Sequence, residues 1–107
     1  MMSDFELFSK YFYINPDGVL CWKVKRRKVD RGQPAGVDRG DGYIRVIFNY
    51  KPYFAHRIVW LLVHGVWPTE VIDHRNRNRG DNRIENLRDV DKAVNGLNRG
   101  PALAYGQ

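Results

Sequence analysis

The sequence is short of the features that mark several classes of protein. It contains one cysteine, Cys21, so it can form no disulfide within the chain and cannot supply the paired thiolates of a common structural zinc site. Its longest apolar run, residues 58–63, stops at His64, far below the roughly 18 apolar residues that a membrane helix needs. The N-terminus has no basic segment followed by a long apolar one, so no signal peptide is expected. These absences favour a protein of the reducing cytoplasm with no membrane partner.

The composition that remains is globular and basic. The chain has 107 residues, the usual size of one domain, and is 43% hydrophobic and 28% charged. Eighteen Lys and Arg against twelve Asp and Glu give a formal net charge of +6. A small basic domain suggests a polyanionic partner, with nucleic acid first and an anionic membrane surface second. The alternative is a basic surface that binds nothing.

The order of patterns along the chain predicts an α+β fold. Residues 19–24 and 43–48 are typical of strands, and 49–52 is typical of a turn that leads into a further strand at 53–55. Residues 56–64 are apolar almost all round and predict a helix that ends at Gly65. Further strands are expected at 70–74 and 85–90, with a short helix at 92–98. We expect one domain over 1–107: a scaffold of sheet and helix at 15–66, a ββα unit at 67–99 and a tail at 100–107.

The chemistry-bearing residues gather after residue 72. If strands 70–74 and 86–90 pair and a helix at 92–98 packs on them, Asp73, His74, Asn86 and Asn95 can converge. Carboxylate and amide oxygens suit a hard cation such as Mg²⁺, whose coordination is completed by water and substrate phosphate. A neighbouring imidazole can then deprotonate a water molecule.

These residues resemble a known motif. Ile72-Asp73-His74, Asp81-Asn82-Arg83, Glu85-Asn86-Leu87-Arg88 and Asn95 resemble the motif of the HNH endonucleases. Gly42-Tyr43, the segment 55–60 and Gly65-Val66-Trp67-Pro68 are similar to the phage and homing members of that group, in the His-Me finger superfamily. The resemblance covers residues 15–98 and implies a ββα-metal fold that hydrolyses phosphodiester bonds with one divalent metal ion. Because it lacks cysteine pairs, the chain resembles the branch of the HNH endonucleases that has no structural zinc.

The resemblance also implies a role for each motif residue. His74 matches the general base, and Asn86 matches the middle Asn, which orients that base. Asp73 and Asn95 match the ligands of Mg²⁺ or Mn²⁺, with Asn98 as the alternative to Asn95. Double-stranded DNA is the implied substrate, and the basic residues predicted to contact it are Arg26, Arg27, Lys28, Arg75, Arg77, Arg79 and Arg83.

The remaining conspicuous residues have structural interpretations. His56 and His64 bracket the apolar helix and are expected to satisfy local groups. Asn82 is expected to brace a loop. The three tryptophans, Trp22, Trp60 and Trp67, are expected in the core.

Two functions from different classes remain after the residues are read. One is an HNH endonuclease that nicks one strand at each site, because the chain holds a single Asp-His…Asn…Asn set. The other is a basic module that binds DNA or RNA without cutting it. A monomer is favoured and a dimer is possible. A phage-encoded chain would act in the cytoplasm of its bacterial host, and homing, restriction-like and packaging roles all remain open, as does the target sequence.

Overall fold

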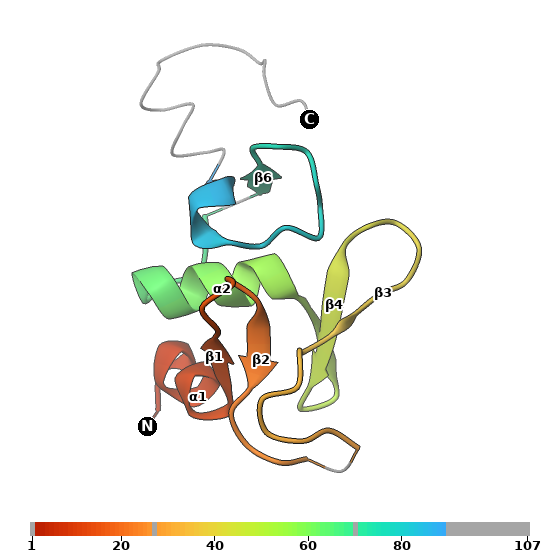
Figure 1. The fold of residues 1–107 in the computed structure, drawn as a ribbon. Helices are drawn as coiled ribbons and strands as arrows, with labels where there is room; N and C mark the ends of the chain where they lie inside the picture. The colour runs from red at the N-terminus through yellow and green to blue at the C-terminus, as the bar shows by residue number, and fades with distance from the viewer. Residues whose placement is uncertain (1, 27, 70, 90–107) are drawn as a thin grey trace.

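A computed structural model describes residues 2–26, 28–69 and 71–89 (Figure 1). The fold is α+β, as the sequence predicts. The elements, in chain order, are α1 (Asp4–Tyr11), β1 (Phe12–Ile14), β2 (Leu20–Trp22), β3 (Val37–Asp38), β4 (Ile44–Phe48), β5 (Lys51–Phe54), α2 (Ala55–His64), β6 (Ile72–His74), the 3₁₀ turn η1 (Ile84–Asn86) and β7 (Leu87–Asp89). All the strand pairs are antiparallel: β1 with β2, β4 with both β3 and β5, and β6 with β7.

The N-terminal helix α1 begins at a complete capping box. The hydroxyl of Ser3 accepts from the backbone N–H of Glu6, and the Glu6 carboxylate accepts from the backbone N–H of Ser3. The helix buries Phe8 and leads directly into β1. Through Phe8 and Phe12, α1 and β1 contribute to the main core.

Helix α2 is the central element of the molecule. Six of its residues are buried, which explains an apolar pattern that runs almost all round the helix. It ends at Gly65, whose φ of 81° is the left-handed conformation that terminates helices most easily in glycine. Figure 1 shows α2 between α1, β1 and β2 on one side and the β6–β7 segment on the other. The helix therefore supports both the core and the predicted site.

An aromatic cluster fills the core below α2. The ring of Phe48 lies 5.0 Å from that of Phe8, 5.2 Å from that of Phe12 and 5.1 Å from that of Tyr11, measured between centroids. Trp22 packs at 4.5 Å on Phe12. Trp22 and Trp60 are buried and Trp67 packs against the cluster, which confirms the expectation that the tryptophans belong to the core.

The hairpin of β4 and β5 differs from its prediction in the length of its turn. Phe48 pairs with Lys51, so Asn49 and Tyr50 alone form the turn, where residues 49–52 were expected to form it. Pro52 lies within β5, opposite Ile47. Proline is tolerated there because β5 is an edge strand of its sheet and its missing N–H breaks no ladder.

The polar segment after residue 70 forms a short hairpin with a long loop. Ile72, Asp73 and His74 of β6 pair with Asp89, Arg88 and Leu87 of β7. The predicted strand 85–90 is in part wrong, because Asn86 lies in the 3₁₀ turn η1 and β7 begins at Leu87. The expected helix at 92–98 and the tail at 100–107 lie outside the described residues. Of the helices in the described part, none is both long and apolar enough to cross a membrane.

Candidate active site

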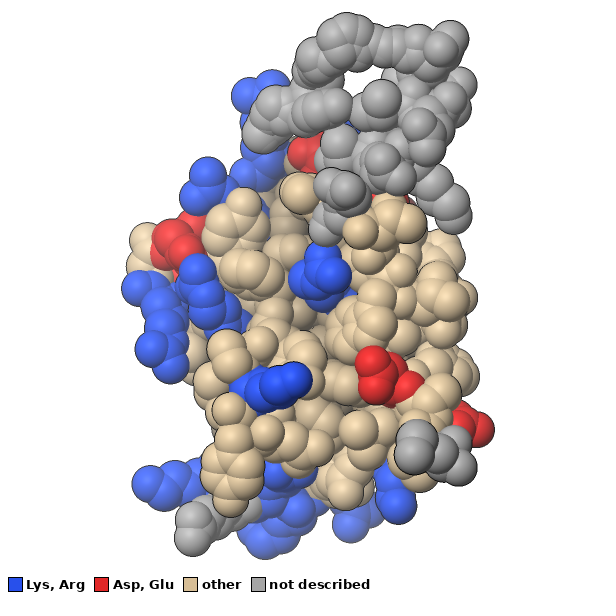
Figure 2. Space-filling view, turned by 180° about the vertical axis from the view of Figure 1, so that it is seen from behind, with Lys and Arg blue, Asp and Glu red and all other residues tan. Residues whose placement is uncertain are grey.

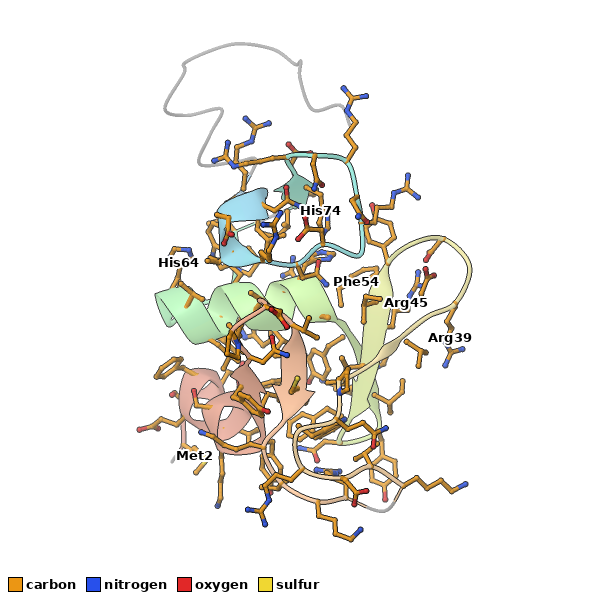
Figure 3. The ribbon with its side chains drawn as sticks, in the orientation of Figure 1. Met2, Arg39, Arg45, Phe54, His64 and His74 are labelled. Carbon is orange, nitrogen blue, oxygen red and sulfur yellow. The ribbon has the colours of Figure 1, made fainter. Side chains whose placement is uncertain are left out.

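His74 is turned inward by the alternation of strand β6. Ile72 and His74 are each 6% exposed, whereas Asp73 between them lies on the other face of the strand and is half-buried. His74 lies over the N-terminal half of α2, and His64 lies at the other end of that helix (Figure 3). The candidate general base therefore stands at the junction between the β6–β7 hairpin and the scaffold.

The ring of His74 is held by Asn82. The Nε2 atom of His74 lies 2.8 Å from Oδ1 of Asn82, and both side chains are buried. An amide oxygen only accepts, so Nε2 carries the proton and donates it in this bond. In the neutral ring the lone pair then lies on Nδ1, the nitrogen that can take a proton from water. Asn82 thus selects one tautomer and one ring orientation, although its residue type suggested only a loop brace.

A second buried histidine, His56, packs against the ring of His74. The ring of His56 meets that of His74 edge to face, with centroids 4.9 Å apart and planes at 88°. Burial, followed by the nearby His74 and Arg57, lowers the pKa of His56 to about 3. Within the described part of the chain, Nδ1 of His56 has no hydrogen-bond partner. His56 is therefore a neutral packing surface for His74, and an unsatisfied nitrogen is the cost of placing it there.

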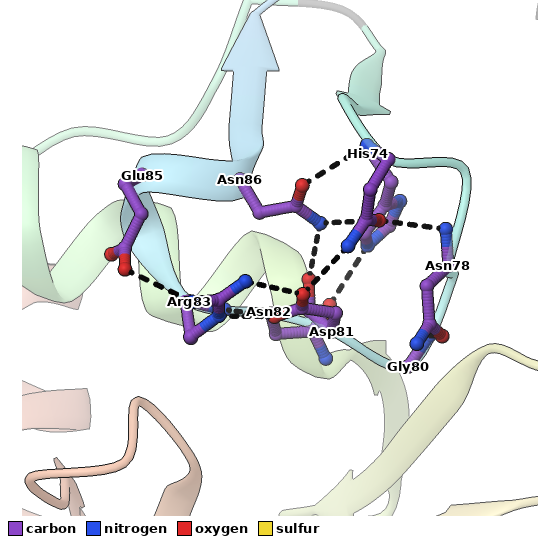
Figure 4. Close-up of polar contacts among 9 residues, drawn as sticks. His74, Asn78, Gly80, Asp81, Asn82, Arg83, Glu85 and Asn86 are labelled. Atoms are coloured by element: carbon purple, nitrogen blue, oxygen red, sulfur yellow. Dashed lines mark hydrogen bonds and ion pairs between the residues drawn. The ribbon is translucent and has the colours of Figure 1, made fainter.

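Asn86 organises the loop between the two strands (Figure 4). Its Oδ1 accepts from the backbone N–H of Asn76, and its Nδ2 donates to Oδ1 of Asn76 and to the backbone carbonyl of Asp81. Its own backbone carbonyl accepts from the N–H of Arg75. Asn86 is 5% exposed, so these bonds are formed away from water. The residue predicted to orient the base thus fixes the loop that carries Asn82, and Asn82 contacts the base.

An ion pair closes the same loop. Arg83 donates through Nε and Nη2 to the two oxygens of Asp81, each at 2.8 Å. This bidentate bond holds the pKa of Asp81 far below its usual range. On the other side of Arg83 lies Gly18, where an added Cβ atom would collide with Cγ of Arg83. The β1–β2 turn therefore packs closely against the loop, and Arg83 is already engaged within the protein.

The hairpin of β3 and β4 also reaches the site. Arg79 donates through Nη1 to the backbone carbonyl of Asp41, and its guanidinium lies 5.0 Å from the ring centre of Tyr43. The Tyr43 ring in turn lies 6.1 Å from that of His74 and 5.8 Å from that of His56. Tyr43, His56 and Asn82 thus surround the base, and none of them was predicted to do so.

Asp73 faces away from His74 and forms an ion pair. Its Oδ2 accepts from Nη2 of Arg88, opposite it on β7, at 2.7 Å. A carboxylate is a suitable donor for a hard cation, but the second predicted ligand, Asn95, lies outside the described residues, as does its alternative Asn98. Within the described ranges no three His, Cys, Asp or Glu side chains gather into a metal-binding group. The donor set in view is therefore one carboxylate, which fits a cation that keeps most of its waters.

The predicted DNA-contact residues fall into two groups. Arg75, Arg77 and Lys28 are exposed, whereas Arg79 and Arg83 have partners within the protein and Arg26 stacks on the rings of Tyr11, Trp22 and Phe48. Arg27 lies outside the described residues. Figure 2 shows Lys and Arg gathered along one side and at the lower end of a face that is otherwise largely uncharged.

Residues 53–97 match a protein family described as HNH endonuclease. No curated protein and no solved structure matches the chain. The matched segment contains α2, the β6–β7 hairpin and its loop, and so includes His56, His74, Asn82 and Asn86 but not Tyr43. HNH nucleases act on DNA and generally use a divalent metal ion. The match covers residues 53–97 of the 107-residue chain and supports an HNH endonuclease.

Proposed function

We propose that this protein is a metal-dependent DNA endonuclease in which His74 is the general base. The observation that carries the proposal is the bond between His74 and Asn82, which leaves Nδ1 of a fixed imidazole as the proton acceptor. His74 is only 6% exposed, so little bulk solvent reaches its ring. The water to be activated would therefore be one held beside the scissile phosphate. The proton of that water would pass to Nδ1 as the oxygen attacks phosphorus.

Asp73 is the proposed metal ligand within the described residues, with Asn95 as its partner from the motif. A bound divalent cation would stabilise the charge that develops at the phosphate and at the leaving oxygen. Arg88 competes for the same carboxylate, because it already donates to Oδ2 of Asp73. Mg²⁺ or Mn²⁺ suits this sparse oxygen donor set, and no structural zinc is required.

Double-stranded DNA is the proposed substrate, cut one strand at a time. The formal charge of +6 and the exposed Arg75 and Arg77 beside the site favour a phosphate backbone. One His74 site acts on one phosphate. A monomer should therefore release a nicked duplex and cut the second strand only in a second event.

A plasmid assay tests these points together. With Mg²⁺ or Mn²⁺, supercoiled plasmid should pass first to the open-circular form and later to the linear form, and EDTA should stop the reaction. His74→Ala should slow cleavage by roughly 10²–10⁴-fold with little effect on DNA binding. His64→Ala, which removes an exposed histidine from the far end of α2, should cut at the wild-type rate. Cleavage by His74→Ala at the wild-type rate would refute the assignment of the base.

The metal assignment has its own pair of variants. Asp73→Ala should raise the metal concentration needed for half-maximal cleavage, because the carboxylate ligand is removed. Arg88→Gln should lower it, because the competing guanidinium is removed. EDTA should leave the melting temperature unchanged. A protein that binds DNA but cuts it with neither metal would instead be the non-catalytic binding module.

A further inference from the structure

The turn between β4 and β5 presents an aromatic side chain to solvent. Tyr50 is 100% exposed, the only large hydrophobic residue in the described part of the chain that is fully so. Asn49 and Tyr50 have φ values of 52° and 65°, so both adopt the left-handed conformation of a type I′ hairpin turn. Such turns favour Asn at the first position and Gly at the second. Tyrosine at the second position therefore carries a conformational cost and gains no packing within the protein.

A basic loop lies beside this turn. Arg26 stacks over Phe48, the residue that precedes the turn, at 5.4 Å from its ring centre, and the backbones of Arg26 and Val29 exchange two hydrogen bonds. The loop is thus held against the end of β4, and Figure 1 shows the two segments adjacent. Figure 2 shows Lys and Arg at the corresponding lower end of the molecule. Three exposed cations, Lys28, Arg31 and Lys51, have no carboxylate partner among the described residues, whereas Lys25 is paired with Asp30.

This surface and His74 lie near opposite ends of strand β4. Tyr43, the residue before β4, lies beside the His74 ring, and the turn lies at the other end of the strand. At about 3.4 Å per residue, the five steps from Tyr43 to Phe48 span roughly 17 Å. That length corresponds to about five base pairs of duplex at 3.4 Å each. A duplex that lies along β4 from the His74 site would therefore reach the turn about five base pairs from the scissile phosphate.

We propose that the β4–β5 turn and the described residues 25, 26 and 28–31 form a second DNA-contact region, in which Tyr50 enters a groove of the duplex. Lys28, Arg31 and Lys51 contact the phosphates on either side, and the tyrosine ring packs against bases and sugars. This inference rests on the proposed function, because it takes duplex DNA as the substrate. It explains why a large aromatic residue occupies a turn position that favours glycine. DNA fits this surface better than a membrane does, because Tyr50 and Ile47 are two isolated apolar side chains and do not form the broad apolar face of an interfacial helix.

The test measures binding without cleavage. Fluorescence anisotropy in EDTA, with a duplex of about 20 base pairs, gives the affinity of wild type, Tyr50→Gly and Tyr50→Phe. Tyr50→Gly should bind roughly 5- to 100-fold more weakly, and Tyr50→Phe should bind as wild type does. Tyr50→Gly should also melt a few degrees higher, because glycine relieves the left-handed turn. Phe5→Ala, which removes a partly exposed ring from α1, should leave affinity unchanged.

Duplex length sharpens the test. A pre-nicked duplex can be trimmed to about three base pairs on the side of the nick that would reach Tyr50, and wild type and Tyr50→Gly should then bind it equally. Trimming the other side should preserve the difference between the two proteins. Equal affinities of wild type and Tyr50→Gly for the full duplex would overturn the inference. It would also be overturned if Tyr50→Gly bound anionic phospholipid vesicles more weakly than wild type but bound DNA equally well. The proposed function fails separately: a protein that shows the Tyr50 effect in EDTA but cuts with neither metal retains this surface and loses the nuclease mechanism.

Discussion

The aromatic core and the loop around His74 are stabilised in different ways. The core buries the rings of Phe8, Phe12, Trp22 and Phe48 against α2, with few polar groups among them. Next to the loop 75–83, Ile72 and Leu87 are the buried apolar residues of the β6–β7 hairpin. The loop itself is held by side-chain hydrogen bonds of Asn76, Asp81, Asn82, Arg83 and Asn86. Apolar burial is non-directional and tolerates exchange of similar side chains, whereas each hydrogen bond requires one donor and one acceptor in place. The core should therefore govern stability and the loop should govern activity.

The largest expected effect on stability lies in the core. Phe48→Ala should lower the free energy of unfolding by about 3–5 kcal/mol, because it leaves a cavity among five aromatic rings. Ile47→Ala, the adjacent residue on β4, is 56% exposed and should change it by less than about 0.5 kcal/mol. Urea denaturation gives both values. Equal decreases would mean that the ring cluster does not dominate the core.

The free energy of unfolding should fall in acid, because His56, which lies between the core and the loop, is buried in its neutral form. The pKa of His56 is about 3 in the folded protein, against 6.5 for an ordinary imidazole. The unfolded chain therefore binds the extra proton as pH falls from about 6.5 to 3, and stability decreases through that window by up to about 1.4 kcal/mol per pH unit. His56→Phe should flatten this decrease. Denaturation curves at pH 7, 5 and 4 test it, and parallel curves for the two proteins would contradict it.

The loop should respond mainly in turnover. Asn82→Ala should reduce kcat by up to about 10²-fold, because the His74 ring is no longer held in one orientation, while KM for DNA should change little. Asn78→Ala is the matched control, since Asn78 lies in the same loop and its side chain accepts from the backbone N–H of Gly80. Nicking time courses at saturating DNA separate the two. A rise in KM alone would place Asn82 in binding.

The smallest expected effect concerns exposed charge. Neutralising Arg75 and Arg77 to Gln should weaken binding to all duplex sequences alike and flatten the log–log salt dependence by up to about 0.9 for each phosphate that is no longer neutralised. Stability should be unchanged, because both side chains are exposed. Lys10→Gln on α1 removes one positive charge outside the proposed DNA surface and should leave the slope unchanged. A slope unaffected by the double variant would remove these arginines from the DNA interface.

Local pattern was sufficient to predict the scaffold. The apolar run of α2 with Gly65, and the alternation of β4, depend on residues close in sequence. The 3₁₀ turn at Ile84–Asn86 could not be predicted in this way, because Asn86 is held by Asn76 and Asp81, five to ten residues away. The motif predicted which segment bears the site. It could not show that Asn82 contacts His74, or that Tyr43 and His56 surround it, because those contacts join separate elements.

The order of these regions along the chain has a consequence for biosynthesis. Within the described residues, every member of the buried apolar cluster except Ile72 and Leu87 precedes residue 62. During synthesis from the N-terminus, the ribosome therefore releases nearly all of the core before the segment that carries His74, Asn82 and Asn86. The nascent chain can collapse on α2 first, and the β6–β7 segment then closes on a surface that already exists. Truncation after residue 69 should therefore leave a nascent polypeptide that collapses but has no nuclease activity.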